Sequence, residues 1–107
     1  MRILFDQGTP VPLRRMLTGH QVDIAYERGW AILTNGDLLT AAEREGFDVL
    51  ITTDQNLRYQ QNLSSRKIAI IVLLSTSWPR IQQHLDVIRK ILDGIVTGTY
   101  HEITIPR

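Results

Sequence analysis

The longest uninterrupted apolar segment of this chain covers residues 68–74, which is seven positions. A helix that crosses a membrane needs about 20 apolar residues, so this segment is too short for that role. A short, wholly apolar run is typical of a strand in a parallel sheet that is covered on both faces. We therefore expect residues 68–74 to form a central parallel strand, which limits the fold to the α/β class.

Four further segments have the pattern of short strands. Residues 3–5 and 49–51 are apolar, as expected for buried strands. Residues 21–25 and 100–105 alternate polar with apolar positions, which is typical of strands with one exposed face. We expect the last of these segments to lie at an edge of the sheet.

The segments between these strands have apolar residues at helical spacing. This spacing occurs at residues 11–17, at 34–46 and at 79–94, while residues 55–63 are expected to be a short helical or looped stretch. The second helix should begin with a capping box and the third with a proline in its first turn. Alternation of strands and helices predicts a three-layer α/β/α domain, residues 1–107, with a mostly parallel, doubly wound sheet.

The composition of the chain excludes several classes of site and of protein. The chain has no cysteine, which excludes disulfides and thiolate metal sites, and its net charge of +1 provides no overall field that attracts a polyanion. No apolar stretch is long enough for a membrane span or a signal peptide, so we expect a cytoplasmic protein. The glycines form no phosphate-cradling run, so we expect no nucleotide cofactor.

Acidic residues follow the strands at one edge of the predicted sheet. Asp6 comes directly after the first strand, Asp54 after the third, and Glu27 just beyond the second. Asp37 lies in the first turn of the helix that leads into the third strand, and that turn faces the same edge. Sites in open parallel sheets form beyond the carboxyl ends of the strands. Clustered carboxylates favour Mg²⁺ or Mn²⁺, and such an ion can activate water against a phosphodiester.

Each of these acids also has an ordinary structural interpretation. Asp54 can cap the following segment, and Asp37 can be the acid of the capping box. Asp6 can organise the turn that follows it through side-chain hydrogen bonds. Glu27 can be a solvated loop residue. The case for a site depends mainly on Asp6 and Asp54, because two strand ends deliver them to the same edge.

A family resemblance covers most of the chain. Five short motifs carry it: Ile3-Leu4-Phe5-Asp6 followed by Pro10, Gly19-His20-Gln21-Val22, Glu27-Arg28-Gly29-Trp30, Asp37-Leu38-Leu39, and Asp48-Val49-Leu50-Ile51-Thr52-Thr53-Asp54. In their order and spacing they resemble the compact bacterial PIN-like proteins catalogued as a domain of unknown function. PIN domains are metal-dependent ribonucleases, many of them toxins of toxin–antitoxin pairs.

The resemblance implies that Asp6, Asp37 and Asp54 are catalytic, metal-binding acids, with Glu27 as a fourth metal ligand. Members of this family commonly have a second acid after the first Asp, where this chain has Gln7. Gln7 offers only a neutral oxygen, so metal affinity should be reduced if that second acid holds the metal.

The basic residues Arg14, Arg15 and Arg58 flank the predicted edge and are candidate contacts to an RNA backbone. The leading hypothesis is therefore a Mg²⁺- or Mn²⁺-dependent endoribonuclease, with RNA as substrate and a small antitoxin protein as a further candidate partner. The alternative is a PIN-like module that binds or scaffolds without catalysis. A phosphoacceptor domain ranks last, because neither lysine follows a late strand. The apolar final strand and Trp78 leave a homodimer open, and no membrane partner is expected.

Overall fold

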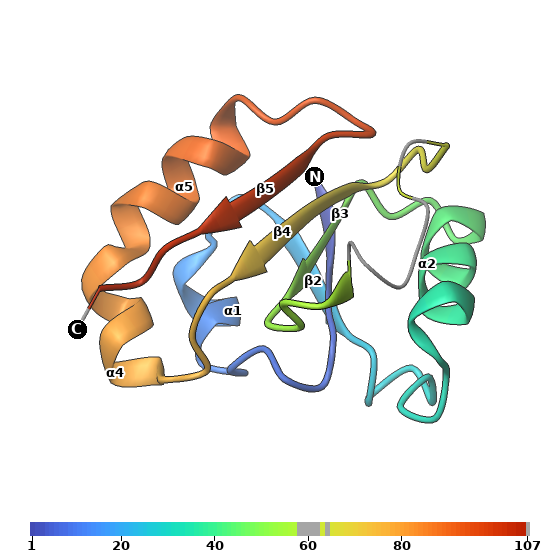
Figure 1. Ribbon diagram of the computed structural model, residues 1–107, viewed down its shortest axis with the longest axis horizontal. Coiled ribbons are helices and arrows are strands. Elements are labelled where there is room, and N and C mark those ends of the chain that lie inside the picture. Colours follow the sequence, from blue (N-terminus) through green and yellow to red (C-terminus); the bar gives the residue numbers. More distant parts are fainter. Residues whose placement is uncertain (58–62, 64, 107) are drawn as a thin grey trace.

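The computed structural model describes residues 1–57, 63 and 65–106. Its centre is a five-stranded sheet in the order β2-β1-β3-β4-β5, and every neighbouring pair of strands is parallel (Figure 1). The strands are β1 (Arg2–Phe5), β2 (Gln21–Ile24), β3 (Val49–Thr52), β4 (Ala69–Leu73) and β5 (Tyr100–Ile103). The prediction of an α/β fold with a mostly parallel sheet is confirmed.

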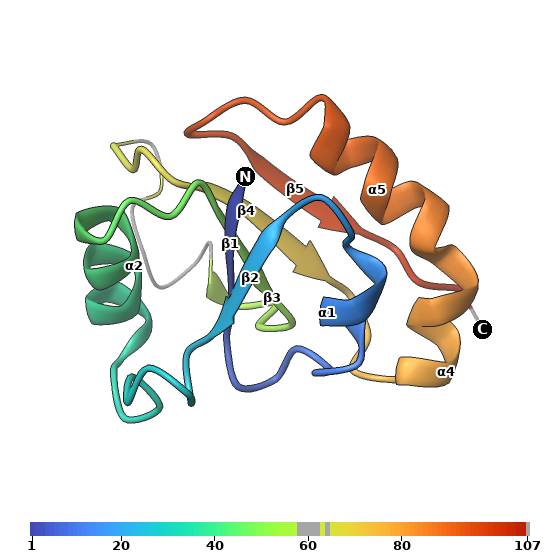
Figure 2. The same ribbon diagram turned by 180° about the vertical axis from the view of Figure 1, so that it is seen from behind.

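Helices cover both faces of the sheet (Figures 1 and 2). One face carries α1 (Leu13–Met16), α4 (Trp78–Ile81), the 3₁₀ turn η1 (Gln82–His84) and α5 (Leu85–Asp93), and the other carries α2 (Asn35–Arg44). Each face of the sheet has its own hydrophobic core. Successive residues of β3 belong to different cores: Ile51 lies in the core under α1 and α5, and Leu50 in the core under α2. The molecule therefore has the three layers that the sequence predicts.

The interior strands are buried along their whole length. Every residue of β3 and β4 is buried, as a parallel strand between two helical layers requires. The central strand is β3, and β4 lies beside it. The final strand, β5, forms one edge of the sheet, as its alternating sequence predicted.

The signals at the ends of α2 have the predicted geometry. The Thr34 hydroxyl accepts a hydrogen bond from the backbone N–H of Asp37, and Gly46 follows the helix with φ of +80°. That left-handed backbone is unfavourable for residues with a Cβ, which explains a glycine at this position.

Two helices differ from the prediction. Residues 11–17 form only the short helix α1, which begins after Pro12 because a proline disfavours helical backbone at the residue before it. The single helix expected over 79–94 is instead α4, η1 and α5 in succession. Most of the stretch 55–63 lies outside the described residues.

The order of the strands decides where a site can form. The chain passes from β1 to β2 on one side and then returns across β1 to β3 on the other, so the strand order reverses between β1 and β3. Ligand sites of open parallel sheets lie at this reversal, beyond the carboxyl ends of the strands. Over the described part of the chain, no helix has the length and apolar character needed to cross a membrane.

Candidate functional site at the carboxyl ends of β1 and β3

Asp6 is the first residue after β1, and hydroxyl groups hold its carboxylate. Thr9 donates its backbone N–H to Oδ1 at 3.2 Å, and the Thr9 hydroxyl lies 2.8 Å from the same oxygen. The Thr52 hydroxyl donates to Oδ2. Both threonines are almost fully buried, so these contacts fix the carboxylate in one orientation.

Burial raises the pKa of Asp6 above 3.8, although hydrogen bonds from Thr52, Thr9 and the backbone of Gly8 act in the opposite direction. The Thr9 hydroxyl has one hydrogen but lies 2.8 Å from two acceptors, Asp6 Oδ1 and the carbonyl oxygen of Ile51. A proton on Asp6 Oδ1 allows both contacts to be hydrogen bonds. A bound proton or cation would therefore stabilise the Asp6 carboxyl group in the folded protein.

Asp54 lies two residues beyond β3 and is oriented from two directions. The side-chain amide of Asn35 donates to Oδ2 at 2.7 Å, and the backbone N–H of Asn56 donates to Oδ1 at 2.9 Å. The second contact closes the turn after Asp54, which is the structural role that the sequence also allowed. Asn35 comes from the start of α2, so this helix is tied to the end of β3.

Thr52 connects the two acids. Its hydroxyl donates to Asp6 Oδ2 and accepts the backbone N–H of Asp54 at 3.0 Å. Sequence reasoning identified Asp6 and Asp54 but missed Thr52, Thr9 and Asn35. The available signal was Thr52 itself, a hydroxyl at the end of an otherwise apolar strand, because a buried hydroxyl needs a partner.

Glu27 forms an ion pair with Arg14, one of the residues that the sequence predicted to contact RNA. The guanidinium of Arg14 binds both carboxylate oxygens of Glu27, at 2.6 and 3.3 Å, and this hydrogen bonding raises the pKa of Arg14. The two predicted functional residues thus neutralise each other. Arg15 is exposed on α1, and Arg58 lies outside the described residues.

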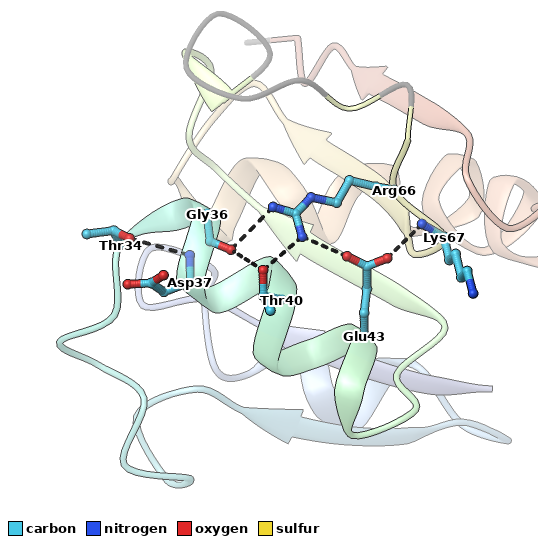
Figure 3. A network of polar contacts seen from close by, with 7 residues as sticks. All are labelled: Thr34, Gly36, Asp37, Thr40, Glu43, Arg66 and Lys67. Atoms are coloured by element: carbon cyan, nitrogen blue, oxygen red, sulfur yellow. Dashed lines mark hydrogen bonds and ion pairs between the residues drawn. The ribbon is translucent and has the colours of Figure 1, made fainter.

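Asp37 is exposed in the first turn of α2. Figure 3 shows its carboxylate on the side away from the network that Arg66 makes along the helix. Arg66 donates to Thr40 Oγ1 and Glu43 Oε1, and Glu43 also accepts the backbone N–H of Lys67. The backbone N–H of Asp37 donates to the Thr34 hydroxyl, which is one half of a capping box and does not involve the Asp37 carboxylate.

Asp6 lies between two hollows of the surface. A pocket of about 410 Å³ extends from Asp6 toward Tyr26, and a smaller hollow of about 140 Å³ extends toward Trp30 and Asn35. Gly8 passes close to Thr53 here, because a Cβ at Gly8 would lie 2.4 Å from the Thr53 hydroxyl. The turn after β1 is therefore packed tightly against the end of β3.

The acids meet only part of the requirement for a metal site. Within residues 1–57, 63 and 65–106, no three acidic or histidine side chains gather closely enough to hold a metal ion. Asp6 and Asp54 remain, at the ends of adjoining strands, and the hydroxyls of Thr9 and Thr52 contact the Asp6 carboxylate. Mg²⁺ that acts on phosphates is commonly held by one or two carboxylates together with substrate oxygens. Carboxylate and hydroxyl oxygens are the donor type that Mg²⁺ and Mn²⁺ prefer, so the chemistry of these residues is compatible with such an ion.

Comparisons with protein-family models, with curated proteins and with solved structures found no match to this chain. The PIN-like resemblance therefore stays a prediction from the sequence motifs. The functional argument depends on the geometry of the β1/β3 edge.

Proposed function

We propose that this chain is a divalent-metal-dependent phosphodiester hydrolase of the PIN-like type that acts on RNA, with Asp6 and Asp54 as its catalytic acids. The observation that supports the proposal is the Thr52 hydroxyl, which bonds both the Asp6 carboxylate and the Asp54 backbone at the reversal of strand order. Asp37 and Glu27 take no part in this link. The proposed site is smaller than the four-acid site that the resemblance implies.

The residues around the two acids have distinct roles in this proposal. Thr9 and Thr52 hold the buried Asp6 carboxylate, and Asn35 directs one oxygen of Asp54. Asp6 and Asp54 would hold Mg²⁺ or Mn²⁺, which when bound polarises the phosphodiester and lowers the pKa of water. A cation also offsets the unfavourable burial of charge at Asp6.

Cleavage of single-stranded RNA with Mn²⁺ tests this function. We expect metal-dependent cleavage by the wild type and its loss in Asp6→Asn and Asp54→Asn. Asp93→Asn is the matched control, because Asp93 is an exposed acid at the end of α5. Cleavage that persists in both site variants would come from a contaminant and would overturn the assignment.

Metal binding provides a readout without RNA. We expect Mn²⁺ to raise the melting temperature of the wild type and of Asp93→Asn, because a ligand that binds only the folded state stabilises it. Asp6→Asn and Asp54→Asn should show a smaller shift. Equal shifts in all four proteins would place the metal elsewhere.

Two observations favour a second candidate, a PIN-like module that binds without catalysis. The predicted ligand Glu27 is neutralised by Arg14, and Gln7 donates its amide to the carbonyl of Ala31 at 3.0 Å. Under this alternative, RNA binds without metal and is not cleaved. The same assays therefore separate the two functions.

The proposal extends to partners. The candidate protein partners are a small antitoxin, if one is encoded next to this chain, and a second copy of the chain. Co-expression with the neighbouring small protein, followed by analytical ultracentrifugation, tests both. A monomer that retains no co-expressed protein would remove them from the proposal.

A further inference from the structure

A pocket beside Asp6 is walled by the loops that follow β1 and β2. It has a volume of about 410 Å³, and its lining includes Asp6, Thr9, Val11, Ile24, Tyr26 and Glu27. This volume lies within the range of about 300–1,000 Å³ that is common for small-molecule sites. The pocket adjoins the carboxylate that we assign to catalysis, so an occupant would lie next to the reacting group.

Two large apolar side chains of this pocket remain open to solvent. Tyr26 is 72 % exposed and Val11 is 54 % exposed, while Ile24 at the end of β2 is buried beneath them. Exposed aromatic rings are the surfaces on which unpaired bases stack in proteins that bind single strands. The ring of Tyr26 thus offers a stacking surface at the mouth of the pocket.

The backbone around Tyr26 is fixed by a tight turn. Trp30 donates its N–H to the carbonyl of Ala25 at 2.9 Å, and Gly29 donates to the carbonyl of Tyr26 at 3.1 Å. Gly29 has φ of +75°, which a residue with a Cβ would adopt only with strain. The turn therefore fixes the backbone from which the Tyr26 side chain extends, which lowers the backbone entropy lost on binding.

The charges around the pocket favour a neutral occupant over a phosphate group. Asp6 and Glu27 line the pocket, so a phosphate group inside it would meet the Asp6 carboxylate and a Glu27 carboxylate that is already paired with Arg14. A neutral, flat group is not repelled in this way. Arg15 is exposed on the neighbouring α1, where it can attract a backbone phosphate outside the pocket, while Arg14 of the same helix is paired with Glu27.

We propose that this Tyr26 pocket binds one unpaired nucleobase of RNA, stacked on the Tyr26 ring, while the adjoining phosphate stays outside the pocket. The inference rests on the proposed function in taking RNA as the bound polymer. It adds a residue that determines which RNA is bound: single-stranded segments are accepted, and duplexes, whose bases are already stacked, are excluded.

The test is the affinity for RNA in the absence of metal, measured by fluorescence anisotropy. The probe is a labelled oligouridine of about 12 nucleotides, in EDTA so that no metal-dependent cleavage can occur. We expect Tyr26→Ala to weaken binding about 5- to 150-fold, the range found for the loss of one base–aromatic stack. Tyr26→Phe keeps the ring and should bind as the wild type does.

Ile32→Ala is the matched control, because Ile32 is 92 % exposed in the same loop but does not line the pocket. Val11→Asp is a second variant at the pocket, and it should also weaken binding. Tyr26→Ala binding equal to that of Ile32→Ala would overturn the inference, as would a wild type that binds no oligouridine. A co-expressed protein that is lost with Tyr26→Ala while RNA affinity is unchanged would also overturn it, because the pocket would then serve a protein partner.

The outcomes for the inference and for the proposed function are distinguishable. RNA binding that depends on Tyr26, without any metal-dependent cleavage, supports the pocket and removes the hydrolase. Cleavage that depends on Asp6 and Asp54, with affinity independent of Tyr26, supports the hydrolase and removes the pocket.

Discussion

The hydroxyl of Thr52 donates a hydrogen bond to the carboxylate of Asp6, although the two residues are 46 positions apart in the sequence. The contact follows from the register of the sheet. Phe5 of β1 is paired with Ile51 of β3, so the next residue of each segment lies at the same height. Parallel pairing of two buried strands thus brings a buried hydroxyl to a partly buried acid.

Replacing Thr52 with Val should destabilise the fold. Val has nearly the same shape, but it removes the donor to Asp6 and the acceptor for the Asp54 N–H. We expect a loss of about 1–3 kcal/mol in the free energy of unfolding, since a buried partner is left unsatisfied. Thr52→Ser keeps the hydroxyl and should lose less. Urea unfolding measures both, and a Val variant as stable as the wild type would contradict the role of this hydroxyl.

The contribution of Asp6 to stability should fall as pH rises. Burial raises its pKa above 3.8 in the folded chain, so the folded state binds this proton more tightly than the unfolded state. The favourable contribution is complete below pH 3.8 and is lost as pH rises through the folded pKa. The free energy of unfolding of the wild type, minus that of Asp6→Asn, should therefore be largest below pH 3.8 and decrease as pH rises through the folded pKa. A constant difference would contradict this.

Glu43 should show the opposite dependence. Burial acts to raise its pKa, but the hydrogen bonds from Arg66 and the Lys67 backbone outweigh this and lower it below 4.5 (Figure 3). Its contribution is present above pH 4.5 and is lost as pH falls through the lowered pKa. We expect Glu43→Gln to be about 1 kcal/mol less stable than the wild type at neutral pH. That difference should shrink in acid, as urea unfolding across pH can measure.

Gly8→Ala should disturb the site through one close contact. The added methyl group would lie 2.4 Å from the Thr53 hydroxyl, so either the turn or the threonine must move. Gly8 does not have a positive φ, so the backbone itself adds no strain. We expect a loss of stability that Thr53→Ala restores in the double variant. A double variant no more stable than Gly8→Ala alone would show that another contact is responsible.

Much of the fold could be predicted because its signals are local. The apolar run at 68–74 predicted β4, and the threonine and glycine at the ends of α2 predicted its limits. The strand order was not predictable in this way, since nothing in the apolar pattern states that β1 lies between β2 and β3. The start of α1 at Leu13, after the predicted start at Val11, was readable from Pro12, but apolar periodicity outweighed it in the prediction.

The candidate site was predictable only where strand ends determine it. Asp6 follows β1 directly and Asp54 lies two residues beyond β3, so topology places them at one edge. The partner of Glu27 depends on how two loops fold, and the structure pairs it with Arg14, 13 positions away. Thr52 was overlooked because threonine is also an ordinary strand residue. The residues around Thr52 in the sequence do not indicate that its hydroxyl contacts Asp6.

Glu27→Gln should strengthen RNA binding. In the wild type, Glu27 holds the Arg14 guanidinium at 2.6 Å, which neutralises a cation near the Tyr26 pocket. Removing the carboxylate charge frees Arg14 for a phosphate, so the slope of log affinity against log salt should steepen by about 0.7, the value for one added contact to a single strand. Arg14→Gln with Glu27→Gln is the control, since it should remove this gain. Anisotropy titrations of oligouridine at several salt concentrations measure the slope, and an unchanged slope in Glu27→Gln would show that Arg14 does not reach the RNA backbone.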